Sequence, residues 1–468
     1  MSLTDHSASD LMRLLRARKV SAAEIMADHL DRIGQVNPEI KALVSLIDPD
    51  EAMALARTAD GTEPTGWMHG LPAAPKDLVA TKGLRTTWGS PLFADHVPEA
   101  DDLVAARQRA AGAIFIGKTN TPEWGHGSHS FNPVHGTTLN PYDRRRGAGG
   151  SSGGAAAALA ARLLAVADGS DMMGSLRNPA AFCNVYGFRP TWGLVPQDAE
   201  GDTYLHTLST EGPMARTIED LARLLETLCG PNPETPFGRA RESFADRLDR
   251  DVAGLRIGWL GDWGGAYPME AGILDQCQQG LKTFEEIGAI IEPVAPPYPA
   301  ERLWHAWITL RAMLNAGAMK ALYADPEKRA RIKPETLWEI EQGQALSAAA
   351  VYEASTIRSR WYARAAKLFR DYDALVMPAA QVWPFPADWR WPQEVAGHAM
   401  DTYHRWMEVV VPVSLVGLPS LCLPVGFGAE GLPMGMQLIG STGSDAKVLS
   451  IGQAYHRATD WPGRRPPL

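Results

Sequence analysis

Residues Gly147 to Thr191 read GAGGSSGGAAAALAARLLAVADGSDMMGSLRNPAAFCNVYGFRPT. This stretch decides the fold, because its glycine-rich turns join an alanine-rich helix to LLAVAD, a short apolar run that is typical of a buried strand. Upstream, the helical pattern DDLVAARQRAAG likewise precedes a strand candidate, AIFIG. This alternation of helices and strands predicts an α/β fold with a buried mixed sheet.

The two ends of the chain extend this prediction. Ser7 with Asp10, and Ser21 with Glu24, form capping boxes that predict two N-terminal helices. Near the C-terminus, VVVPVSLVGLPSLCLPVGF and GMQLIGS are apolar and strand-like, so we expect the far end of the chain to complete the sheet. Between them, the polar segment 231–250 predicts a linker with a helix, and LRIGWLGDW predicts a further strand.

These patterns together predict one large domain rather than two independent ones. We expect a central, twisted, mixed β-sheet flanked by helices, with a helical insertion that is rich in tryptophan. The expected parts of this 1–468 domain are a core at about 60–215, the helical Trp-rich insertion at about 297–407 and C-terminal strands at about 408–468.

The composition excludes several classes of protein. The chain has 468 residues, 45% of them hydrophobic, and a net charge of −9 without a Lys/Arg-rich block, so nucleic acid is not an expected partner. No apolar stretch reaches the length of a membrane span. The four cysteines lack the spacing of a zinc site, and the N-terminus lacks a signal peptide. We therefore expect a cytoplasmic monomer or homodimer.

Lys76 is a candidate base, because it lies in the apolar run LPAAPKDLVA. If this segment is buried, loss of solvation lowers the pKa of the amine and makes a neutral lysine available. Asp77 could oppose this by pairing with the ammonium group, but adjacent residues of a strand point to opposite faces. A solvated lysine at the end of a strand would give the same pattern, so Lys76 alone does not decide the function.

Two serines lie in glycine-rich turns. Ser175 follows DMMG, where a turn can direct several backbone N–H groups at one point, as an oxyanion requires. A plain glycine–serine loop would explain Ser175 as well. Ser151 lies in GGSSGG, which could bind phosphate at the following helix, although the GK[ST] ending of a P-loop is missing. Two serines and a lysine in apolar surroundings favour acyl transfer at an amide-type bond.

Taken together, the motifs resemble the amidase signature family. The resemblance rests on GGSSGG, GSDMMGSLRNPAA…GFRPT, the lysine of GLPAAPKD, GKTNTPEWGHGS…NPVHGTTLNP, VGLPSLCLPVG and LPMGMQLIG. It covers most of the chain and implies the amidase signature fold. It also implies hydrolysis of the C–N bond of a small amide, including aryl amides or carbamates (urethanes), with no cofactor and no metal.

The resemblance assigns roles to individual residues. It implies that Ser175 is the nucleophile, that Ser151 is a bridging serine held by an unusual cis peptide bond, and that Lys76 is the base. In the implied mechanism, neutral Lys76 accepts the proton of Ser151, which takes that of Ser175, and an acyl-enzyme forms. The implied oxyanion hole consists of the backbone amides of Met172, Met173, Gly174 and Ser175. The implied supporting residues are Ser152, Asp171 and Arg177.

One departure from the family lies in the expected oxyanion loop. Many members have Thr-Gly or Ile-Gly where this chain has Met172 and Met173. The backbone N–H groups survive this change, but a position that needs a positive φ would resist a side chain. We therefore expect a subgroup with a more apolar pocket.

The specificity residues are less clearly marked. The eight tryptophans between Trp304 and Trp406 can be core residues, or some can form an aromatic funnel over Ser175 that favours aryl or bulky acyl groups. The histidines His126, His129 and His135 lack metal-site spacing, and we expect them in a loop along one wall of the site. The candidate substrate-binding residues are Trp124, Gly125, Asn178, Trp383 and Trp389.

Two other functions remain open at this stage. The chain could be the ammonia-releasing subunit of a tRNA-dependent amidotransferase, which works only with partner chains. It could also be a non-catalytic binding protein on the same scaffold. The complete set of Lys76, Ser151 and Ser175 speaks against the second alternative.

Overall fold

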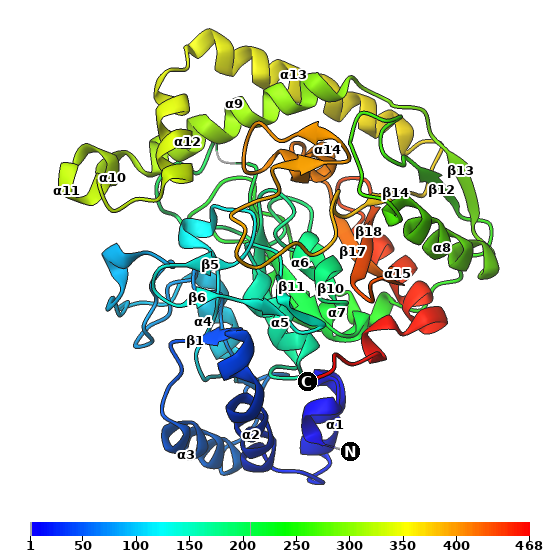
Figure 1. Ribbon diagram of the computed structural model, residues 1–468. Coiled ribbons are helices and arrows are strands. Elements are labelled where there is room, and N and C mark those ends of the chain that lie inside the picture. Colours follow the sequence, from blue (N-terminus) through cyan, green and yellow to red (C-terminus); the bar gives the residue numbers. More distant parts are fainter. Residues whose placement is uncertain (1, 206) are drawn as a thin grey trace.

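An eight-stranded mixed sheet runs through the middle of the protein, seen in a computed structural model that describes residues 2–205 and 207–468 (Figure 1). Its strand order is β13-β12-β14-β18-β17-β10-β11-β9. β12 pairs in parallel with β13 and β14, and the other neighbouring pairs are antiparallel, which confirms the predicted mixed sheet. The strands are β9 (Val166–Asp171), β10 (Tyr186–Arg189), β11 (Thr210–Ala215), β12 (Arg256–Trp259), β13 (Ile290–Pro293), β14 (Ala374–Pro378), β17 (Ser420–Phe427) and β18 (Pro433–Ile439).

The C-terminal strands complete this sheet, as predicted. β17 pairs with β10, with Gly187 opposite Cys422, and β18 lies between β17 and β14. The C-terminal strands β17 and β18 therefore lie between β14 and β10, so strands from distant parts of the chain form one sheet. The short paired strands outside the sheet are β1 (Leu43–Val44), β2 (Pro72–Ala73), β3 (Ile114–Phe115), β4 (Lys118–Thr119), β5 (Phe131–Asn132), β6 (Gly136–Thr137), β7 (Leu139–Asn140), β8 (Asp143–Gly147), β15 (Glu394–Val395) and β16 (His398–Ala399).

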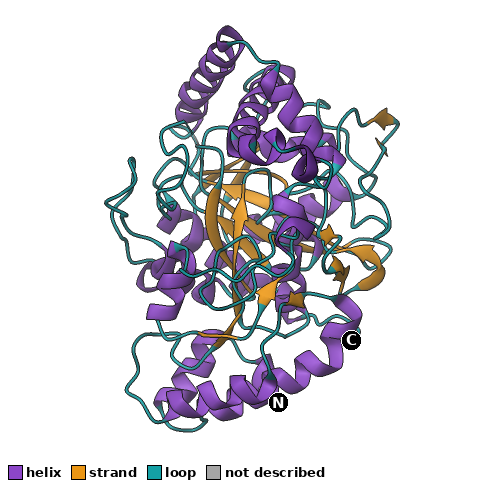
Figure 2. Ribbon diagram, turned by 90° about the vertical axis from the view of Figure 1, so that its left-hand side faces the viewer, coloured by secondary structure: helices purple, strands orange, loops and turns teal. Residues whose placement is uncertain are grey.

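Helices cover the sheet on both sides (Figure 2). Both predicted N-terminal caps are confirmed: the Ser7 hydroxyl accepts from the Asp10 N–H, and Ser21 forms a full capping box with Glu24. The helices are α1 (Ala8–Arg16), α2 (Ala22–Ile40), α3 (Pro49–Asp60), α4 (Leu103–Ala110), α5 (Gly153–Ala160), α6 (Asn178–Phe182), α7 (Ile218–Leu228), α8 (Ile273–Glu286), α9 (Ala300–Ala318), α10 (Lys320–Ala324), α11 (Pro326–Arg329), α12 (Pro334–Gln344), α13 (Ala348–Leu368), α14 (Val411–Ser414) and α15 (Asp445–Thr459).

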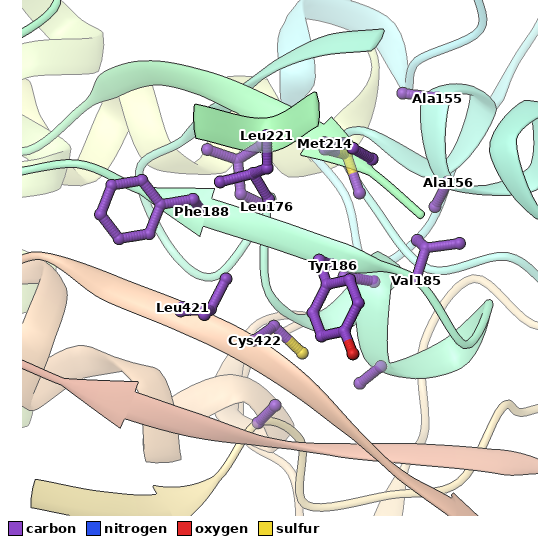
Figure 3. Packing of buried hydrophobic residues seen from close by; sticks show 14 of the residues in the cluster. Ala155, Ala156, Leu176, Val185, Tyr186, Phe188, Met214, Leu221, Leu421 and Cys422 are labelled. Atoms are coloured by element: carbon purple, nitrogen blue, oxygen red, sulfur yellow. The ribbon is translucent and has the colours of Figure 1, made fainter. Parts of the chain in front are cut away.

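The core around β10 and β17 fixes the strands that carry the site. Figure 3 shows Tyr186 and Phe188 of β10 beside Leu421 and Cys422 of β17, all buried. The alanine-rich α5 packs closely on its neighbours, since a Cβ at Gly154 would lie 2.2 Å from the backbone nitrogen of Asn120. Small residues in this helix therefore allow close backbone approach behind the GGSSGG turn.

Two boundary predictions are wrong, and a third is confirmed only in part. The helix expected within 231–250 is a single 3-10 turn, Ala245–Arg247, because the proline-rich start of this segment cannot continue a helix. The helical insertion ends at Leu368, and β14 follows it inside the central sheet. The AIFIG run forms only the two-residue β3, which pairs with β2 outside the central sheet.

A membrane-spanning helix must be long and apolar at once. Across residues 2–205 and 207–468, no helix meets both conditions.

Candidate active site

Alternation along β9 separates two groups of polar residues. Asp168 and Ser170 are two residues apart on this strand, so their side chains share one face of the sheet, and Asp171 points to the other. Glu211 of β11 is the cross-strand partner of Ser170, which places its side chain on the Ser170 face. The Lys76 side chain reaches this face, since its Nζ lies 2.9 Å from Ser170 Oγ, and the loop that carries Ser175 follows Asp171.

Lys76 is fully buried and is surrounded by hydroxyl groups. Its Nζ lies 2.7 Å from Ser151 Oγ, 2.9 Å from Ser152 Oγ and 2.9 Å from Ser170 Oγ. Its backbone N–H donates to Asp168 Oδ2 at 3.0 Å, which fixes the start of the side chain. Of the two alternatives left open by the sequence, the structure thus shows the buried lysine, and its amine contacts both serines of GGSSGG.

Burial lowers the pKa of the Lys76 amine, and the negative charges of Glu211, Asp168 and Asp171 oppose this shift. Burial also raises the pKa of Glu211, whose Oε2 is buried without a hydrogen-bond partner among the described residues. Asp77 does not oppose the shift, because it accepts from the N–H and hydroxyl of Thr87. The local electrostatics therefore favour a neutral amine more than an exposed lysine would.

The turn that carries Ser151 is fixed from both sides. The Gly150–Ser151 peptide bond is cis, as the resemblance implies. The Gly150 N–H donates to Asn178 Oδ1 at 3.1 Å, and Ser130 Oγ donates to the Ser151 carbonyl at 3.2 Å. Asn178 therefore positions this turn, and it is not among the residues that line the pocket, contrary to its predicted role in substrate binding.

Asp171 organises the loop that carries Ser175. Its carboxylate accepts from the N–H groups of Gly174 and Leu176 at 2.9 and 3.1 Å, and it forms buried ion pairs with Arg177 and Arg189. Burial alone would raise the pKa of Asp171, but the two arginines hold it well below its usual range. The structure thus confirms that Asp171 and Arg177 shape the loop, and it adds Arg189, for which no role was predicted.

The expected oxyanion donors do not all remain available. The Gly174 N–H is directed at Asp171, whereas the N–H groups of Met172, Met173 and Ser175 donate to no other described group. The positive φ of this loop, +79°, falls on Gly174, where a Cβ would also meet Val410 at 3.0 Å. Met173 is therefore tolerated, because the left-handed position is the next residue.

Replacing Asp171 with asparagine is expected to destabilise the fold. The change leaves the buried guanidinium groups of Arg177 and Arg189 without a counter-charge, which costs about 3–5 kcal/mol. Because the native pKa of Asp171 is lowered, this stabilisation is present at neutral pH and is lost only in strong acid. Denaturant unfolding near pH 7 would measure the loss; an unchanged midpoint would contradict this account.

Ser151 and Ser175 line one pocket of about 100 Å³. Its wall combines the serine hydroxyls with a cation, aromatic rings and sulfur. The lining residues are Leu78, Trp124, Gly125, His126, Gly127, Ser151, Ser170, Met172, Met173, Ser175, Ser209, Arg311, Tyr403, His404 and Met407. The predicted substrate contacts Trp124 and Gly125 thus reach the pocket, and Met172 and Met173 contribute to its wall.

Trp383 and Trp389 lie elsewhere, so the prediction that they form an aromatic funnel over Ser175 is wrong. They line a separate pocket of about 680 Å³, between α8 and the loop that follows β17. Trp304, Trp307, Trp361 and Trp406 are buried core residues. Among the described tryptophans, Trp124 lines the Ser175 pocket, and it stacks on Trp88 with 5.9 Å between ring centres.

The three histidines separate in the structure. His126 lines the pocket, as predicted for this loop, and its Nδ1 lies 2.9 Å from Thr336 Oγ1. His129 Nε2 lies 2.7 Å from the Trp389 carbonyl, and His135 lies next to Asp77. Within the described chain, no group of three His, Cys, Asp or Glu side chains could hold a metal ion.

Several residues in or beside the pocket were not predicted from the sequence. Ser170 directly follows Gly169 and precedes Asp171, and strand alternation on LLAVADGSD could have placed it beside Lys76. Glu211 and Arg311 carry no such signal, because they reach the site through strand pairing and helix packing between distant segments.

Comparison with known proteins agrees with this geometry. The family model described as Amidase matches residues 24–449. An acylamidase from Rhodococcus erythropolis is 31% identical over 98% of this chain and 97% of its own length. The A-type subunit of a glutamyl-tRNA(Gln) amidotransferase from Methylobacillus flagellatus is also 31% identical, over 99% of both chains.

A solved structure shows the same fold. A bacterial aryl acylamidase of the amidase signature enzymes superposes with a TM-score of 0.91 at 28% identity, over 98% of this chain and 99% of that one. The family match, the fold and the lysine–serine cluster all agree. The chain therefore belongs to the amidase signature family, whose members act on carbon–nitrogen bonds.

Proposed function

We propose that this protein hydrolyses the C–N bond of a small linear amide through an acyl-enzyme on Ser175. The observation that carries this proposal is the buried Lys76 amine, 2.7 Å from Ser151 Oγ, on a turn that shares its pocket with Ser175. A serine hydroxyl is a weak nucleophile until a neighbouring base takes its proton. Here the buried amine supplies that base without a histidine.

The mechanism follows from these positions. Lys76 accepts the proton of Ser151 while Ser151 takes the proton of Ser175, whose oxygen attacks the carbonyl carbon. The N–H groups of Met172, Met173 and Ser175 stabilise the oxyanion, and each donor of this kind contributes about 2.7–4 kcal/mol in the transition state. Ser151 then returns a proton to the departing amine, and water releases the acyl group by the same route.

The proposed substrates are aryl amides, with carbamates and esters as further candidates. The aryl acylamidase likeness and the ring of Trp124 in the pocket wall support an aryl group. A panel of acyl anilides, aliphatic amides, amino-acid amides and carbamates tests the choice. Fastest turnover of aliphatic amides by the purified protein would contradict the aryl assignment.

The second candidate is an amidotransferase A-type subunit that requires partner chains. The relatives that are A-type subunits of glutamyl-tRNA(Gln) amidotransferases favour it, because they match over nearly the whole chain. The two functions differ in what the isolated chain can do. We expect the purified protein to hydrolyse acyl anilides alone, without a metal, a cofactor or another chain.

This expectation can be checked by following release of the aromatic amine spectroscopically, with and without a chelator. Amide hydrolysis that appears only after addition of partner chains would favour the amidotransferase function.

A further inference from the structure

The lining of the Ser175 pocket contains hydrogen-bond donors that the described residues leave without an oxygen acceptor. Arg311 of α9 lines the pocket and is 6% exposed. Its Nε donates to Glu339 at 3.0 Å, and its Nη2 donates to Tyr403 Oη at 2.9 Å. Among the described residues, its Nη1 donates only to the Met172 sulfur, at 3.0 Å, and a thioether is a weak acceptor.

The second donor is Trp124. Its indole Nε1 is buried and has no partner among the described residues. Indole and guanidinium groups can only donate hydrogen bonds, so neither can pair with the other. Among the described residues that line the pocket, none carries a carboxylate. A ligand that forms a hydrogen bond with either of these donors must therefore carry an acceptor atom.

The charge balance limits what this acceptor can be. Glu339 neutralises Arg311 in a buried ion pair, and both Asn315 and Tyr403 also donate to Glu339. The pair has no net charge, so a substrate carboxylate would enter as an uncompensated buried charge, which is unfavourable. A neutral oxygen accepts the hydrogen bond without that penalty.

The position of Met172 indicates which part of the substrate lies near Arg311. Met172 belongs to the loop that holds the oxyanion in the proposed mechanism, whereas Ser151 hands its proton to the leaving nitrogen. Gly125 and Leu78 lie on the Ser151 side, since a Cβ at Gly125 would be 3.7 Å from Ser151 Oγ and 2.9 Å from the Leu78 side chain. The Arg311 donor, against Met172, therefore faces the acyl side.

We propose that Arg311 Nη1 binds a neutral oxygen on the acyl side of the substrate, separate from the reacting carbonyl. An ether oxygen or a second carbonyl oxygen has this chemistry. The inference rests on the proposed amide hydrolysis and narrows its substrate class to small acyl groups that carry such an oxygen. Arg311 is then a specificity residue, and its contact with Met172 gives way to the substrate.

A matched pair of anilides tests this inference. Methoxyacetanilide and butyranilide differ only by an oxygen in place of a methylene in the acyl chain. We expect Arg311→Lys, and the charge-balanced double variant Arg311→Met/Glu339→Gln, to lower the kcat/KM ratio of the ether to the alkyl substrate by about tenfold relative to the unaltered protein. The difference in intrinsic reactivity cancels, because all proteins receive the same two substrates.

The alternative is that Arg311 only holds Met172 in place. In that case both Arg311 variants and Met172→Leu, which removes the sulfur contact but keeps the guanidinium, would slow both anilides by one common factor. That result would overturn the inference. Faster turnover of malonanilic acid, whose acyl chain carries a carboxylate, than of methoxyacetanilide would overturn the choice of a neutral oxygen.

The same experiment distinguishes failure of this inference from failure of the proposed amide hydrolysis. Turnover of both anilides with an unchanged ratio in the Arg311 variants contradicts the subsite alone. Absence of Ser175-dependent turnover of both anilides contradicts the proposed hydrolysis, and the subsite with it.

Discussion

Ser175→Ala is expected to abolish hydrolysis, lowering kcat by at least about 10⁴-fold. The variant loses the only atom that forms the acyl-enzyme in the proposed mechanism, while the N–H groups of Met172 and Met173 stay in place. The fold should be unaffected, because the hydroxyl is replaced by hydrogen in a loop that Asp171 holds through Gly174 and Leu176. Steady-state kinetics and thermal unfolding measure both effects.

Covalent labelling makes this prediction specific to one residue. A fluorophosphonate should add one adduct to the unaltered protein, on Ser175 by peptide mass spectrometry, and none to the Ser175→Ala variant. Ser359→Ala, a change on the exposed face of α13, is the matched control and should label and turn over normally. An adduct on another serine, or residual turnover in Ser175→Ala close to that of the control, would refute the assignment.

Local patterns predicted a large part of this molecule. The two N-terminal caps, the mixed sheet and its completion by C-terminal strands were predicted from hydrophobic periodicity and turn residues, whereas the position of β17 and β18 in the middle of the sheet was not. The family resemblance, carried by the Gly147–Thr191 stretch, implied that Ser151, Ser152 and Ser175 belong to one site, and in the structure α5 and β9 lie between them in the chain. Burial of Lys76 followed from its apolar neighbours.

The remaining parts of the site depend on contacts between distant segments. Glu211 reaches Lys76 through the pairing of β11 with β9, and Arg311 reaches Met172 from α9. No residue near either position in the sequence signals these contacts. The error on Trp383 and Trp389 has the same origin, since composition marks a segment as aromatic but not which pocket it lines.

The direction of the Gly174 N–H could not be predicted from the sequence either. A glycine before the nucleophile suggests a free amide, but the Asp171 carboxylate accepts from it. The sequence did not show which residue of this loop has a positive φ. In the structure that residue is Gly174, so Met172 and Met173 avoid the strained conformation. The sequence therefore did not predict the backbone conformation of single residues in this loop.

Lys76→Ala should lower kcat/KM by about 10²–10⁴-fold, the usual contribution of general acid–base assistance. It should also change the pH dependence. Only the neutral amine can accept a proton, so activity of the unaltered protein should rise with pH through the pKa of Lys76, which burial places below the ordinary value of 10.5. In Lys76→Ala this rising limb should vanish, with unfolding measured at each pH to exclude loss of the fold.

A substitution of Glu211 tests more directly whether Lys76 is the base. Its carboxylate raises the pKa of Lys76 by charge, and it lies on the same sheet face through its pairing with Ser170. Glu211→Gln removes that charge at nearly constant shape, so the rising limb of kcat/KM should move to lower pH. Glu353→Gln, the same change at an exposed position of α13, should leave it in place. A limb at the ordinary lysine value, or one that Glu211→Gln does not move, would show that another group supplies the base, because the titration of a buried lysine must respond to the buried carboxylate whose charge affects its pKa most.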